Sequence, residues 1–93
     1  MKTIFILMAQ YSGLAVIPLD TVCTDYFFHL DATKLKRKVA LGEIDLPIVQ
    51  IEGSQKSARG VHINDLAQYI DKQHQAAKDD HDKLWGRKKT SST

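Results

Sequence analysis

Residues 31–42 read Asp-Ala-Thr-Lys-Leu-Lys-Arg-Lys-Val-Ala-Leu-Gly. This stretch predicts a short helix with clear ends, because Asp31 is a favoured N-cap and Gly42 supplies a left-handed stop. At about 100° per residue, three apolar residues share one narrow side of it: Ala32, Leu35 and Val39. So short a helix is not stable alone in water, and we therefore expect neighbouring elements to hold it.

The outer side of this helix is basic. It carries four cations and no acid within the helix body: Lys34, Lys36, Arg37 and Lys38. An ordinary surface helix in contact with water would explain any one of these residues by itself. Four of them together favour a surface that meets phosphate.

The elements before this helix predict a helix-turn-helix. Residues 19–28 follow Pro18 and place apolar side chains at helical spacing, and a short turn then leads through Leu30 into Asp31. Helix, short turn and capped helix are typical of that motif. The first apolar segment, residues 4–11, has both helical spacing and strand-like chemistry, and we favour a helix.

The elements after this helix predict a β-hairpin. Residues 48–51 and 61–63 have strand character, and the polar loop of residues 52–59 joins them. An ordinary surface hairpin is one interpretation. The other is a DNA-binding wing, formed by residues on the loop that reach a minor groove or phosphates: Gln55, Lys56, Ser57 and Arg59.

A last helix is predicted with Asn64 as its cap, and its apolar side ends at Asp71. We therefore divide the chain into a domain of residues 1–71, a polar helical extension of residues 72–86 and a disordered basic tail of residues 87–93. Leu84 and Trp85 have no place in the predicted core. They indicate either self-association or a segment that folds back.

Composition narrows the class of protein. The 93 residues suffice for one small domain with a net charge of +2. From Lys34 to Arg59, six cations face three acids, so the charge is segregated along the chain. The lone Cys23 forms no internal disulfide and is expected to be a packed thiol in a reducing cytoplasm. The apolar start is too short to span a bilayer.

Nothing in the sequence demands catalysis. There is no glycine-rich phosphate loop, no nucleophile elbow and no paired-carboxylate motif. His74 and His81 stand two helical turns apart, too far to share one ion within one chain. We expect no enzymatic activity, no cofactor and no metal.

Many spaced residues resemble the pyocin activator (PrtN) family. They span residues 1–71, and the most specific run is Ser-Gln-Lys-Ser-Ala-Arg-Gly-Val-His at residues 54–62. Others are Met8-Ala9-Gln10-Tyr11, Ala15-Val16-Ile17-Pro18-Leu19, Asp25-Tyr26-Phe27, Leu46-Pro47 and Asp65-Leu66-Ala67-Gln68-Tyr69-Ile70-Asp71. More distantly, the order of helix-turn-helix, Gly42, Leu46-Pro47 and wing is similar to phage excisionases and MerR-like proteins.

The resemblance implies a small cytoplasmic transcription activator of prophage or phage-tail-like bacteriocin genes, which binds double-stranded DNA upstream of them. The implied fold is a mainly α winged helix-turn-helix of the MerR and excisionase type, with a small β-hairpin. Two departures matter. Lys36 stands where family members commonly carry an apolar residue, and the residues after Asp71 carry no resemblance.

The resulting hypothesis assigns roles within the basic helix. Thr33, Lys34 and Arg37 approach base edges in the major groove, with Arg37 suited to a bidentate contact to guanine. Lys36 and Lys38 hold phosphates, as do Lys56 and Arg59 of the wing. One such domain has a small footprint, so we expect several copies to associate on repeated sites, with RNA polymerase as a candidate partner and a nucleoid-associated location.

Three alternatives remain open. Two keep the fold: a directionality factor (excisionase) for a phage integrase, or a repressor. The third is a protein-binding module, such as an inhibitor of a host factor, whose basic face meets an acidic protein. A flat salt dependence of DNA binding would favour this third alternative.

Overall fold

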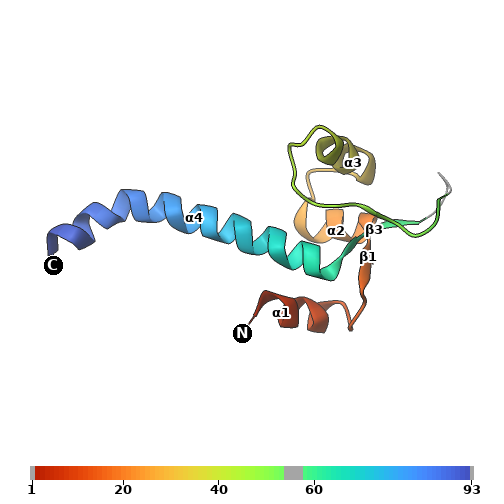
Figure 1. Cartoon of the computed structure of the whole chain (residues 1–93), viewed down its shortest axis with the longest axis horizontal. Helices are drawn as coiled ribbons and strands as arrows, with labels where there is room; N and C mark the ends of the chain where they lie inside the picture. The colour runs from red at the N-terminus through yellow and green to blue at the C-terminus, as the bar shows by residue number, and fades with distance from the viewer. Residues whose placement is uncertain (1, 54–57, 93) are drawn as a thin grey trace.

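A computed structural model gives the structure of the chain and describes residues 2–53 and 58–92. Over these residues the chain forms four helices and one three-stranded antiparallel sheet. Their order is α1 (Thr3–Gln10), β1 (Val16–Pro18), α2 (Leu19–Tyr26), α3 (Ala32–Ala40), β2 (Val49–Gln50), β3 (Arg59–His62) and α4 (Ile63–Ser92). The predicted fold class, mainly helical with a small β-hairpin, is confirmed. Figure 1 shows the first three helices and the sheet gathered at one end of the long α4.

The sheet has β3 at its centre and the order β1-β3-β2. β2 and β3 form the predicted antiparallel hairpin, with Val49 opposite Gly60. The pairing of β1 with β3, which places Ile17 opposite Val61, was not predicted. The sequence prediction treats residues 14–17 only as an extended entry, because a pairing between segments this far apart leaves no local spacing signal.

Gly60 is the residue that lets β1 approach β3. A Cβ atom at this position would lie 2.5 Å from the carbonyl oxygen of Ile17 and 2.8 Å from a side-chain carbon of Val16. Both distances are shorter than real contacts, and one of the atoms belongs to the backbone, which does not move aside cheaply. Glycine at this position is therefore a packing requirement.

The core forms where the helices cover the sheet. Ile17, Val61 and Leu66 bring β1, β3 and α4 together, and each is fully buried. The remaining buried apolar side chains come from all four helices, from the residue after α2 and from the segment after α3: Leu7, Leu19, Val22, Cys23, Phe27, Leu35, Leu46, Ile63 and Ala67. Each helix thus contributes part of its apolar side to one cluster, as expected for a chain of this size.

The start of α4 differs from the prediction. Strand β3 ends at His62 and the helix begins at Ile63, so Ile63 is not a strand residue and Asn64 is not the cap. The Nδ1 atom of His62 accepts the backbone N–H of Asn64 at 3.1 Å and does the capping instead. Histidine is not among the preferred N-cap residues, which is why the sequence pattern favoured Asn64.

The end of α4 also extends further than the sequence suggested. The helix runs to Ser92, through residues 87–92 that the sequence assigns to a disordered tail. Adding residues to an existing helix is far cheaper than starting one, and Arg and Lys are good helix formers. The division into residues 1–71, 72–86 and 87–93 stays a prediction.

Hydrogen bonds between side chains attach α1 to the rest of the domain. The Tyr11 hydroxyl donates to Asp25 Oδ2 at 2.6 Å, and the Tyr26 hydroxyl donates to Gln10 Oε1 at 2.8 Å. Burial, then the bond to Asp25, raises the pKa of the Tyr11 hydroxyl. At the other end of α1, the Thr3 hydroxyl donates to Asp71 of α4. In the part of the chain that the structure describes, no helix combines the length and apolar character needed to cross a membrane.

Replacing Gly60 with Ala is predicted to destabilise the protein by about 1–3 kcal/mol, because the new methyl group overpacks against β1. Urea unfolding followed by circular dichroism measures the change. Gly53→Ala is the matched control, since a Cβ atom there meets nothing within 4 Å. Equal midpoints for the two variants would contradict the close approach of β1 to β3.

Candidate nucleic-acid interface

Both ends of α3 are formed as the sequence predicts. Asp31 Oδ1 accepts the backbone N–H of Lys34 at 2.8 Å, which makes it a true N-cap. At the other end Gly42 has a φ of +76°, and the N–H of Glu43 donates to the carbonyl of Lys38 at 2.9 Å. This is the six-to-one hydrogen bond of a Schellman stop. The basic residues are therefore presented on a helix with defined ends.

Burial divides α3 into the predicted inner and outer sides. Leu35 is fully buried, and Ala32 and Val39 pack partly against the core. Thr33, Lys34 and Arg37 are exposed on the opposite side. The flanking positions of Lys36 and Lys38 are half-buried, as expected for long side chains that cover apolar surface with their methylene groups.

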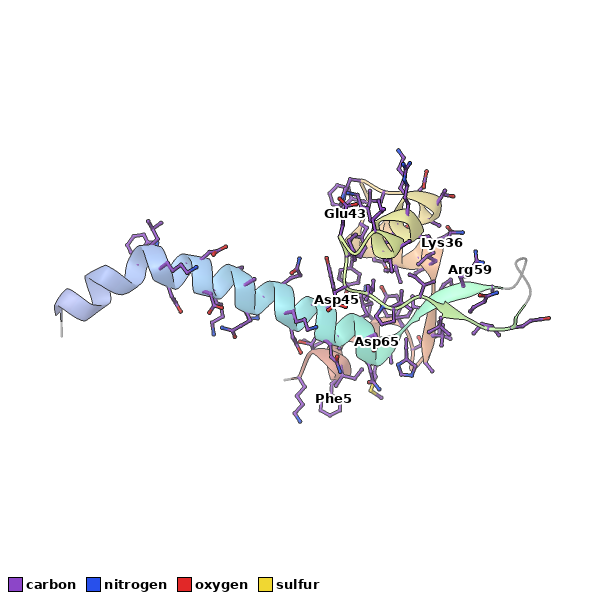
Figure 2. All side chains as sticks on the ribbon, turned by 45° about the horizontal axis from the view of Figure 1, so that its top comes forward. Phe5, Lys36, Glu43, Asp45, Arg59 and Asp65 are labelled. Atoms are coloured by element: carbon purple, nitrogen blue, oxygen red, sulfur yellow. The ribbon has the colours of Figure 1, made fainter. Side chains whose placement is uncertain are left out.

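β1, α2 and β3 meet beside α3 at a shallow groove of about 320 Å³. Lys36 of α3 and Arg59 of β3 both line it, and Figure 2 shows them on the same side of the domain. The other lining residues come from the end of β1, the start of α2, α3 and the segment before β3: Pro18, Leu19, Asp20, Ala32 and Ala58. The fold thus joins the basic helix and the hairpin into one surface.

The start of α2 is part of this surface, and the sequence analysis missed it. Pro18 precedes the helix and provides no side-chain cap, so the first amides of α2 are without one. The positive end of the helix dipole lies there, and Asp20 in the first turn offsets part of it. A proline just before a helix was visible in the sequence. The sequence did not show that this proline lies beside Arg59, because that position depends on the pairing of Pro18 with Gly60.

Asp20 lines the groove, but three other acidic side chains lie away from Lys36 and Arg59. Figure 2 shows Glu43 and Asp45 in the segment after α3 and Asp65 at the base of α4, away from Lys36 and Arg59. Asp45 accepts a hydrogen bond from Lys72 Nζ at 2.8 Å, which attaches this segment to α4. Both side chains are well exposed, so this ion pair contributes little stability.

The predicted wing is seen only in part. Arg59 begins β3 and is half-buried, and the N–H of Ile51 donates to the carbonyl of Ala58 at 3.1 Å at the base of the hairpin. Gln55, Lys56 and Ser57 lie outside the described residues. Their predicted contacts with DNA stay a prediction.

The structure places the other candidate residues apart from one another. Cys23 is buried, and burial, with smaller contributions from Asp20 and Asp31, raises the pKa of its thiol. His74 and His81 are exposed on α4. Among the described residues, no three His, Cys, Asp or Glu side chains are arranged to hold a metal ion.

Comparison with known proteins identifies the family of the chain. A family model described as pyocin activator protein PrtN matches residues 3–77, which is most of the chain. No curated protein and no solved structure matches the chain significantly.

Replacing Asp31 with Ala is predicted to cost about 0.5–2 kcal/mol, because the first turn of α3 loses its hydrogen-bonded cap. Chemical unfolding gives the free energy. Asp31→Asn is the control: its amide oxygen accepts the same N–H, so most of the stability returns although the charge is lost. An unchanged stability in Asp31→Ala would show that the cap does not hold α3.

Proposed function

Since the chain belongs to the pyocin activator protein PrtN family, we propose that it is a transcriptional activator that binds double-stranded DNA upstream of its target genes. The proposed targets are prophage or phage-tail-like bacteriocin genes. In this proposal the protein acts in the cytoplasm, contacts RNA polymerase, has no enzymatic activity and needs no cofactor.

One observation carries the proposal: α3 is capped at both ends and exposes Thr33, Lys34 and Arg37. Thr33 and Arg37 lie nearly opposite the buried Leu35, at about 160° around the helix, and Lys34 lies at about 100°. A helix of this diameter fits the major groove of B-DNA. In that position Arg37 donates two hydrogen bonds to one guanine. Thr33 and Lys34, on the same side, reach neighbouring base edges.

The groove beside α3 supports the second part of the proposal, the contact with the DNA backbone. Lys36 and Arg59 supply positive charge from two elements, of which Asp20 in the first turn of α2 offsets a part. The uncapped start of α2 lines the same groove and adds backbone donors. These groups fix the position of α3 without reading sequence. We assign α2 and α3 to the helix-turn-helix and the β2–β3 hairpin to its wing.

Replacing Arg37 with Ala is predicted to raise the free energy of binding to the preferred site by about 1–3 kcal/mol and to relax the preference at one base pair. Fluorescence anisotropy with a set of singly substituted sites measures both effects. Lys38→Ala is the matched control, because a phosphate contact weakens all sequences alike. If Arg37→Ala kept both affinity and base preference, α3 would not be the recognition helix.

Binding to DNA is predicted to weaken steeply with salt. Each phosphate that the protein neutralises contributes about −0.9 to the slope of log K against log salt concentration. Lys36→Ala should therefore make the slope shallower by about 1, and Asp82→Ala on the far part of α4 should leave it unchanged. A flat slope in the unmodified protein favours instead a partner that is an acidic protein.

A further inference from the structure

The groove beside α3 contains one acid as well as two cations. Among the described residues that line it, Asp20 carries the negative charge, and Lys36 and Arg59 carry the positive charges. Asp20 lies in the first turn of α2, and its side chain is exposed. The fold therefore brings one acid and two basic residues together from three different elements.

In the part of the chain that the structure describes, the carboxylate of Asp20 has no ion-pair partner. Asp20 forms a hydrogen bond through its backbone carbonyl, which accepts from the Thr24 hydroxyl at 3.0 Å. The ion pair among the described residues joins Lys72 to Asp45 instead. The neighbouring Asp31 uses its carboxylate to cap α3. The charge of Asp20 therefore remains available to act on whatever enters the groove.

This charge lies where a phosphate would be attracted. The first amides of α2 are without a side-chain cap, so the positive end of the helix dipole faces outward there. Two cations line the same groove from α3 and β3. Cations and free amides together attract an anion, and a carboxylate satisfies them as a phosphate does. Asp20 belongs to the chain, so it is present there before any DNA binds.

We propose that Asp20 is an internal counterion: its charge opposes phosphate binding beside Lys36 and Arg59 and thereby limits the affinity of the protein for DNA. This inference rests on the proposed function, because it requires the groove to face the DNA backbone. Phosphates carry no sequence information. The effect of Asp20 is therefore the same for every DNA sequence, and the choice of site is left to the base contacts of α3.

Asp20 also has a structural effect, which a matched variant separates from the proposed one. An acid in the first turn of a helix stabilises that helix through the dipole. Asp65 has the same place in the first turn of α4, and Figure 2 shows it away from Lys36 and Arg59. Asp65→Asn therefore removes the same kind of charge from a helix end without changing the groove.

Asp20→Asn is predicted to bind DNA about 5-fold more tightly, because one charge that repels phosphate is removed. Fluorescence anisotropy at fixed salt concentration measures the affinity for the footprinted site and for a scrambled duplex of the same length. The factor should be the same for both. Asp20→Glu keeps the charge and should keep the affinity of the unmodified protein, and so should Asp65→Asn. Circular dichroism checks that each variant is folded.

Two results with DNA would overturn the proposal. One is an unchanged or weaker affinity in folded Asp20→Asn. The other is a gain limited to the footprinted site, because Asp20 would then act on a base and not on phosphate. In both cases, binding of DNA by the unmodified protein would leave the proposed function standing.

Inorganic pyrophosphate tests the groove without DNA. The protein is titrated with it, and nuclear magnetic resonance follows the backbone amides. Binding should be tighter in Asp20→Asn than in the unmodified protein, with the largest shifts at Leu19, Lys36 and Arg59. This result without DNA binding by either protein would support the counterion and contradict the proposed function. Equal binding to the two proteins, or shifts away from the groove, would overturn the inference.

Discussion

The antiparallel pairing of β1 with β3 is the contact on which the rest of the structure depends. It joins residues 16–18 to residues 60–62, and it requires Gly60 to have no side chain. α2 continues directly from β1 and α4 continues directly from β3, so one pair of strands sets the positions of both helices. α3 packs on α2, and its Leu35 is buried in the core. The basic surface beside Lys36 and Arg59 follows from that arrangement.

Much of this could be read from the sequence, and two of the failures share one physical cause. The ends of α3 were predictable because Asp31 and Gly42 act on their nearest neighbours, and burial of Leu35 followed from helical spacing. The pairing of β1 with β3 joins residues more than 40 positions apart, and local spacing carries no sign of it. For the same reason, the sequence did not show that the start of α2 lies beside Arg59. At α4, a histidine performs the capping that the pattern assigned to Asn64.

The sequence predicted which residues belong to the candidate site, but not how the fold arranges them. The sequence identified the basic residues and their exposed side, and the structure brings Lys36 and Arg59 to one groove. Asp20 lines the same groove, whereas Asp45 is paired with Lys72 and Asp71 accepts a hydrogen bond from Thr3. The domain therefore gathers basic side chains from α3 and β3 at one groove, which also contains Asp20. The chain belongs to the pyocin activator family, and contact of this basic surface with DNA is our proposal.

A footprint of the purified protein on the DNA that flanks its own gene tests the central claim most directly. The experiment uses near-physiological salt and excess competitor DNA, with Arg37→Ala run in parallel. Protected repeats upstream of a promoter, lost in Arg37→Ala, are the predicted result. Protection confined to an attachment site would support an excisionase instead. No protection by the folded protein would contradict DNA recognition through α3.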